Sequence, residues 1–134
     1  MIECPSCHAL MNEIPLACLR CGFLVNQIDG FPSWAPESAT QNTGDFFDLN
    51  KFSELATLEN ANFWFQARNE LILWALKRYF DRPSRIAEIG CGTGFVLSAI
   101  ERAYPAADLV GTELFVEGLK FAALRCARAN LFQL

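Results

Sequence analysis

The stretch "IAEIGCGTGF" (residues 86–95) decides the fold class, because an apolar run ending in a carboxylate leads into a turn with three glycines in five positions. Gly90, Gly92 and Gly94 stand between a predicted strand over 85–89 and a predicted helix over 94–104. Glycines accept unusual φ values there and let the backbone approach a ligand closely. The stretch therefore predicts a nucleotide-binding loop at the end of a strand.

Two acidic residues narrow the class of ligand. The spacing is G-x-G-x-G rather than the dinucleotide pattern G-x-G-x-x-G, and Glu88 stands two residues before Gly90. A carboxylate at that place would repel a pyrophosphate and attract an ammonium group. Glu113 ends the next predicted strand, where an acid commonly accepts the hydroxyls of a ribose. The alternative for Glu113 is a solvated residue at a strand end.

The elements around the loop alternate between strand and helix. Helices are predicted over 51–61, 62–80, 94–104 and 115–129, and strands over 85–89, 108–112 and from 131 onward. This β-α-β-α-β order predicts a parallel sheet with right-handed crossovers in an α/β domain. Three strands make the first half of a Rossmann-like fold, so we expect a truncated form of it. The apolar run 71–76 predicts that its helix is deeply packed.

Four of the six cysteines lie within the first 21 residues, in the pairs "CPSC" (4–7) and "CLRC" (18–21). Two such pairs can supply the four sulfur ligands that a structural zinc ion prefers. Cys4, Cys7, Cys18 and Cys21 are therefore the predicted metal ligands. His8 as a ligand is disfavoured because four sulfurs already close the site. The alternatives are two disulfides, which a reducing cytosol disfavours, or four free thiols.

Composition sets further limits. The chain has 134 residues, 52% of them apolar, and a net charge of −4, which offers no basic surface for nucleic acid. The longest apolar run has too few residues to span a membrane, and no signal peptide is evident, so we expect a cytoplasmic protein. The predicted division is a zinc ribbon (1–32), a linker (33–50), N-terminal helices (51–83) and a partial ligand-binding domain (84–134).

The motifs also resemble a known family. "AEIGCGTG" (87–94) followed by "LVGTEL" (109–114) resembles motifs I and II of the class I S-adenosylmethionine-dependent methyltransferases. The block "FWFQARNELILWALKRYF" (63–80) resembles the segment before motif I in a subgroup that carries an N-terminal zinc ribbon. The resemblance covers nearly the whole chain and implies a Rossmann-like methyltransferase fold that binds S-adenosyl-L-methionine.

The resemblance also implies roles for individual residues. Glu88 would organise the amino end of the methionyl group, and Glu113 would hold the ribose hydroxyls. The cofactor would lie on the loop residues, with Cys91 contributing only its backbone; these residues are Gly90, Cys91, Gly92, Thr93 and Gly94. Arg68, among three aromatic residues, would meet the methionyl carboxylate. Its alternative is a surface arginine paired with Asp45 or another acid.

The function expected from these residues is methyl transfer from S-adenosylmethionine to an unidentified acceptor, with a small molecule favoured. No catalytic base is evident. The family's adenine-contacting acid and substrate-facing motif would follow the third and fourth strands, so residues 1–134 alone are expected to be inactive. Two alternatives are an RNA methyltransferase that uses the ribbon to bind RNA and a non-catalytic zinc-ribbon interaction module.

Overall fold

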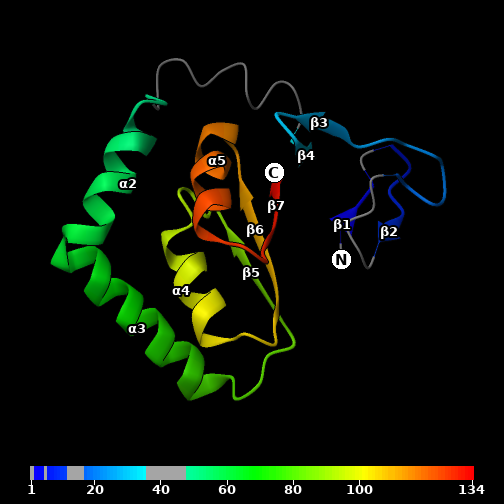
Figure 1. Cartoon of the computed structure of the whole chain (residues 1–134). Helices are drawn as coiled ribbons and strands as arrows, with labels where there is room; N and C mark the ends of the chain where they lie inside the picture. The colour runs from blue at the N-terminus through cyan, green and yellow to red at the C-terminus, as the bar shows by residue number, and fades with distance from the viewer. Residues whose placement is uncertain (1, 5, 12–16, 36–47) are drawn as a thin grey trace.

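The computed structural model describes residues 2–4, 6–11, 17–35 and 48–134 (Figure 1). Two short strands, β1 (Ile2–Glu3) and β2 (Leu10–Met11), pair within the cysteine segment. A hairpin follows, formed by β3 (Asn26–Ile28) and β4 (Phe31–Ser33). The rest of the described chain consists of α2 (Lys51–Ala61), α3 (Phe63–Tyr79), β5 (Arg85–Ile89), α4 (Phe95–Ala103), β6 (Asp108–Glu113), α5 (Val116–Arg125) and β7 (Asn130–Gln133).

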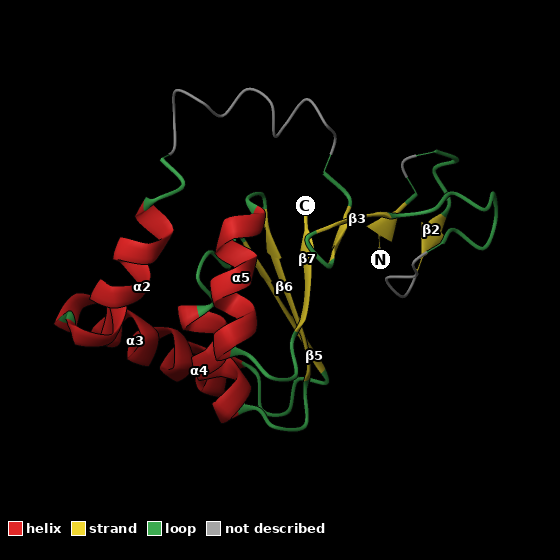
Figure 2. Cartoon of the chain, turned by 45° about the horizontal axis from the view of Figure 1, so that its top comes forward, coloured by secondary structure: helices red, strands yellow, loops and turns green. Residues whose placement is uncertain are grey.

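The main sheet has the strand order β3-β4-β7-β6-β5, and β5, β6 and β7 run parallel. Helices α2 to α5 lie on one side of this sheet, and the cysteine segment lies on the other side (Figures 1 and 2). Glu88 pairs with Gly111 in the register of β5 and β6, so the glycine turn and Glu113 meet at the same edge of the sheet. The predicted α/β class, with the β-α-β-α-β half of a Rossmann-like fold, is confirmed.

The core lies between the sheet and two of the helices. Leu97 of α4, Leu109 of β6 and Leu119 of α5 are fully buried, and Ile86 and Leu131 pack beside them. Parallel strands normally bury both faces. Here residues 86 and 109 face the helices, whereas alternate positions such as Ala87 and Ile89 are exposed. The helix-covered face therefore holds the packed core of the described chain.

Most predicted elements match the structure within two residues, but α5 does not. The sequence predicted a helix to residue 129, and α5 ends at Arg125. The Glu101 carboxylate of α4 accepts hydrogen bonds from the backbone N–H groups of Ala127, Arg128 and Ala129 at 2.7–3.2 Å. These bonds satisfy the backbone of an extended segment. A carboxylate far away in the sequence therefore determines where the helix gives way to β7.

The predicted deep packing of α3 is wrong. Leu71 and Trp74 are 62% and 58% exposed, and Asn69 is the buried residue of this helix. One side of α3 faces α2 and α4, and in the described part of the chain the other side faces solvent. A helix segment with apolar residues on every side can be buried without an energetic penalty. The sequence of the segment does not show which neighbours are present.

The β3–β4 hairpin extends the sheet beyond β7, although the sequence analysis placed residues 26–32 with the ribbon. Ser33 pairs with Gln133, and the Ser33 hydroxyl donates to Gln133 Oε1 at 2.7 Å. Phe31 packs against the main core and Trp34 against the cysteine segment. The hairpin thus joins the two parts, and the proposed domain boundaries stay predictions. Residues 36–47, most of the predicted linker, lie outside the described residues.

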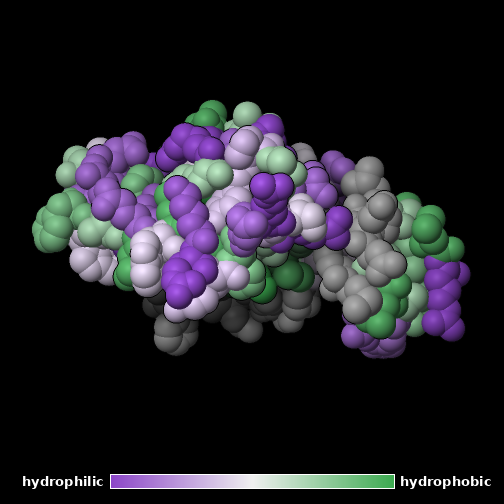
Figure 3. All heavy atoms as spheres, turned by 90° about the horizontal axis from the view of Figure 1, so that it is seen from below, coloured by the Kyte–Doolittle hydropathy of each residue, from purple (hydrophilic) through white to green (hydrophobic). Residues whose placement is uncertain are grey.

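Hydrophilic and hydrophobic residues are mixed on the face of the molecule in Figure 3, with the cysteine segment forming a lobe at one end. Among the described residues, no helix combines the length and apolar character needed to cross a membrane.

Candidate functional site

The glycine turn connects β5 to α4 with three left-handed glycines. Gly90, Gly92 and Gly94 have φ values of 72°, 53° and 73°. A side chain at Gly94 would meet α5, because a Cβ there would lie 2.8 Å from Ala122 Cα. At Gly90 and Gly92 nothing lies within 4 Å of the Cβ position. Gly94 therefore permits close packing, whereas Gly90 and Gly92 present open backbone to a ligand.

Glu113 stands at the end of β6 and faces the turn. Its Oε2 accepts the backbone N–H of Gly92 at 3.0 Å, and its Oε1 accepts that of Phe115 at 3.1 Å. Glu113 is therefore not a free, solvated acid, which was the alternative from the sequence. Each carboxylate oxygen can accept a second hydrogen bond. The position stays compatible with the predicted binding of a ribose diol.

Glu88 and Arg68 form a half-buried pair of opposite charges beside the turn. Burial raises the pKa of Glu88 to about 7, and the Arg68 charge and the backbone N–H of Leu97 oppose this shift less strongly. Among the described residues, neither Glu88 Oε2 nor Arg68 Nε has a hydrogen-bond partner. The Arg68 guanidinium lies 5.0 Å from the Trp64 ring and 5.3 Å from the Phe65 ring, which hold it in place.

Unpartnered buried polar atoms of both signs suit a ligand that carries both an ammonium and a carboxylate group. Asn69, the next residue of α3, is a buried polar residue that sequence reasoning did not single out. Its Oδ1 has no partner among the described residues, and its Nδ2 donates to Phe95 O at 3.4 Å. The available signal was a small amide directly after Arg68. Asp45, the alternative partner for Arg68, lies outside the described residues.

Cys91 and Thr93, the other two loop residues, are buried and point away from solvent. Burial, followed by the negative charges of Glu88 and Glu113, raises the pKa of the Cys91 thiol to about 12. The backbone N–H of Cys91 donates a hydrogen bond to Thr112 O at 2.7 Å. The expected contribution of Cys91 through its backbone stays a prediction. The Thr93 hydroxyl is also engaged within the protein, and the whole residue is 1% exposed, so its predicted contact with a ligand stays a prediction.

The partners of Thr93 form a buried cluster that sequence reasoning missed entirely. Thr93 Oγ1 donates to Glu59 Oε2 at 2.6 Å and accepts from Arg125 Nη1 at 2.8 Å. Arg125 also forms an ion pair with Glu59 and donates to Ala56 O. These groups come from α2, the glycine turn and α5. No sequence motif connects positions so far apart, so only the folded chain brings them together.

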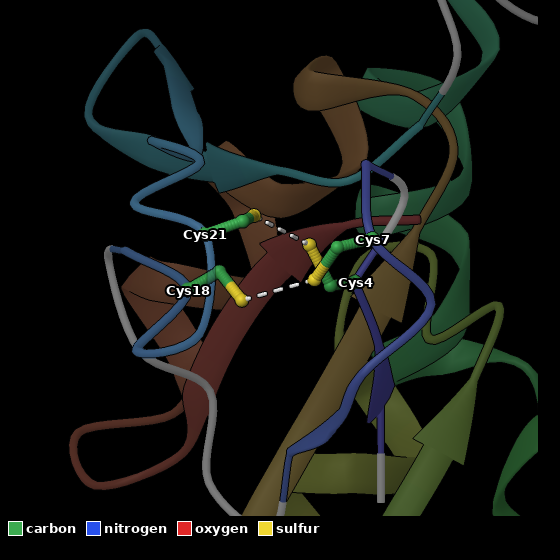
Figure 4. A group of neighbouring side chains, drawn as sticks. All are labelled: Cys4, Cys7, Cys18 and Cys21. Carbon is green, nitrogen blue, oxygen red and sulfur yellow. Dashed lines mark hydrogen bonds between the residues drawn. The ribbon is translucent and has the colours of Figure 1, made fainter.

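The four predicted metal ligands converge on one point (Figure 4). Their sulfur atoms all lie within 4.8 Å of one another, with Cys4–Cys21 and Cys7–Cys18 distances of 3.8 Å and 3.7 Å. A tetrahedral zinc site with bonds of about 2.3 Å places its sulfurs about 3.8 Å apart. The spacing therefore fits a tetrahedral metal ion, and it excludes S–S bonds of about 2 Å.

The two cysteine pairs share one backbone conformation. His8 N–H donates to Cys4 O at 2.9 Å, and Gly22 N–H donates to Cys18 O at 2.8 Å. Both residues have positive φ, 57° for His8 and 73° for Gly22. Left-handed histidine is strained, and a bond of 2.6 Å between His8 Nδ1 and Glu3 Oε1 accompanies it. The His8 side chain is thus held by Glu3, outside the cluster of sulfur atoms.

A hollow of about 800 Å³ has none of residues 90–94 in its lining. It is lined on the sheet by Arg85, Ala87, Ile89, Asp108, Val110 and Thr112, which alternate with the core-facing positions. The candidate site itself lies at the carboxyl ends of β5 and β6.

Comparison with known proteins gives a limited result. No family model and no curated protein matches the chain. Among solved structures it is similar to Streptomyces venezuelae DesVI, with 24% identity and a TM-score of 0.49, over 65% of this chain and 36% of DesVI. It is also similar to the plantazolicin methyltransferase BpumL, solved with a pentazolic desmethylPZN analog and SAH. There the identity is 26% and the TM-score 0.47, over 62% of this chain and 33% of BpumL. The chain thus spans about one third of each.

Proposed function

We propose that this chain binds S-adenosyl-L-methionine as the cofactor-binding part of a methyltransferase whose acceptor is a small molecule. The observation that carries the proposal is the half-buried pair Glu88 and Arg68 beside a glycine turn whose backbone is open. Among the described residues, Glu88 Oε2 and Arg68 Nε have no hydrogen-bond partner. A nucleoside joined to an amino acid has the complementary groups. Its ammonium matches Glu88, its carboxylate matches Arg68, and its ribose diol matches Glu113.

When bound, the cofactor supplies a sulfonium methyl group, and the protein's task is to hold that group in line with the acceptor. Gly90 and Gly92 would let the ligand lie on the backbone. Glu88 and Arg68 would orient the amino-acid end, and Glu113 would orient the ribose while it fixes Gly92. The net charge of −4 and the acids of the ribbon make RNA an unfavourable acceptor.

The proposal predicts that S-adenosylhomocysteine (SAH) binds the protein with micromolar affinity in isothermal titration calorimetry. 5′-Methylthioadenosine keeps the nucleoside but lacks the amino acid, so it leaves Glu88 and Arg68 unpartnered and should bind at least about 100-fold more weakly. Equal affinities would contradict the assigned roles of Glu88 and Arg68. If the folded protein does not bind SAH, the remaining hypothesis is the non-catalytic interaction module. Salt-sensitive retention of the protein on an RNA column would favour the RNA methyltransferase.

Glu88 also predicts a pH dependence. Burial raises its pKa to about 7 in the free protein, and only the ionised carboxylate attracts the ligand's ammonium. SAH affinity should therefore rise with pH, by up to about tenfold per unit below pH 7, and level off above it. Glu88→Gln should bind weakly and without this dependence. Glu117→Gln, a partly exposed acid in the first turn of α5, is the control and should keep the wild-type profile.

We further propose that Cys4, Cys7, Cys18 and Cys21 hold one structural zinc ion and that the protein is cytoplasmic, where thiols stay reduced. Elemental analysis of the purified protein should find about one zinc per chain. Cys18→Ser should lose most of it, because it removes one of four sulfur ligands. Cys126→Ser changes a buried cysteine outside the cluster and should keep the zinc. A metal-free wild-type protein would refute the site.

A further inference from the structure

Two carboxylates accept hydrogen bonds from neighbouring residues of the glycine turn. Glu113 accepts the N–H of Gly92 at 3.0 Å, as described above. At the next residue, the Thr93 hydroxyl donates to Glu59 at 2.6 Å. Glu113 faces the predicted ligand, whereas Glu59 lies in the interior with 3% of its surface exposed. The second carboxylate therefore acts on the turn without access to a ligand.

The groups around Thr93 form a closed set. Thr93 is 1% exposed, and its hydroxyl donates to Glu59 and accepts from Arg125. Arg125 pairs with Glu59 through Nη1 and donates to Ala56 O through Nη2 at 2.8 Å. The guanidinium also lies 5.4 Å from the Phe95 ring, which follows the turn. Charge and hydrogen-bonding capacity are thus matched within the protein, without a ligand.

Thr93 is flanked by the two glycines that need restraint. Gly92 and Gly94 both have left-handed φ, and glycine loses more conformational freedom on ordering than any other residue. A tether on the residue between them limits the backbone of both. Since Glu59 belongs to α2 and Arg125 to α5, the packing of these helices determines where the tether is anchored.

We infer that Glu59, Thr93 and Arg125 form a positioning cluster that holds the glycine turn in its ligand-binding conformation. Thr93 acts through its hydroxyl tether and does not bind the ligand with its side chain. The inference rests on the proposed function, since the ligand is S-adenosylmethionine or SAH. It assigns α2, which precedes the Rossmann-like part, a role in preparing the binding surface.

The test replaces the hydroxyl alone. Thr93→Val keeps the size of the side chain and the Glu59–Arg125 pair but removes the tether. By calorimetry its SAH affinity should fall about fivefold, which corresponds to about 1 kcal/mol for one hydrogen bond. Thr93→Ser retains a hydroxyl and should bind nearly as the wild type does. Thr112→Val is the matched control, because Thr112 is also buried and its hydroxyl has no partner among the described residues.

Amide hydrogen exchange supplies a readout that does not depend on the ligand. In Thr93→Val the N–H groups of Gly92 and Gly94 should exchange faster, while that of Leu109 in the core should not change. Wild-type affinity in Thr93→Val, or equal protection of the turn, overturns the inference. Failure of the wild type to bind SAH refutes the proposed function instead, and the exchange rates then still decide whether the tether exists. If Thr93→Val does not fold, Thr93→Ser decides: loss of affinity despite its hydroxyl overturns the inference.

Discussion

Gly94→Ala is expected to lower the free energy of unfolding by about 2–5 kcal/mol. The left-handed φ of 73° costs a side-chain-bearing residue about 1–2 kcal/mol. The added Cβ would also lie 2.8 Å from Ala122 Cα and 2.9 Å from Ala122 Cβ. Because the nearest atom belongs to the backbone of α5, the contact cannot be relieved by a rotamer change, and overpacking adds about 1–3 kcal/mol. Urea denaturation followed by circular dichroism measures the change.

Gly92→Ala is the matched control for this prediction. Its φ of 53° carries a similar strain, but nothing lies within 4 Å of the added Cβ. Its stability should fall by only about 1–2 kcal/mol. Its SAH affinity should fall strongly, since the methyl group occupies the surface offered to the ligand. Gly94→Ala should therefore lose more stability than Gly92→Ala does. Equal destabilisation of the two variants would show that contact with α5 does not restrict Gly94.

Glu59→Ala is expected to destabilise the protein by about 3–5 kcal/mol. It leaves the Arg125 guanidinium, whose side chain is 17% exposed, without its counter-charge in the interior. It also removes the acceptor of the Thr93 hydroxyl. Thermal and urea unfolding of the variant measure the loss.

Two control variants test whether the loss of stability comes from a buried unpaired charge or from the removal of an acidic residue as such. Asp108→Ala removes an exposed ion pair with Arg85, in which the atoms lie 3.7 Å apart, and should cost less than about 1 kcal/mol. The double variant Glu59→Met/Arg125→Met replaces the buried pair by apolar side chains and should recover much of the stability. A cost for Glu59→Ala as small as that for Asp108→Ala would contradict the buried role of the pair.

Local patterns predicted the elements well because short-range preferences determine them. Helix α2 spans the predicted residues 51–61, and β5 spans 85–89. The glycines of the turn have the left-handed φ that their spacing suggested. The end of α5 was missed because Glu101, 24 residues before Arg125 along the chain, binds the backbone that follows the helix. The roles proposed for the site residues stay predictions until the binding experiments are done.

The amino-acid sequence alone was sufficient to predict the β-α-β-α-β architecture, the glycine turn with its two acids and the clustering of four cysteines. Each of these follows from a local pattern: the periodicity of strands and helices, the spacing of the glycines, an acid at a strand end and the Cys-x-x-Cys pairs. Folding decided that Thr93 faces Glu59 and not a ligand, that Arg68 lies beside Glu88, and that the Leu71 side of α3 is exposed. These features depend on which surfaces pack together. Packing joins residues distant in the chain, so no local pattern records it.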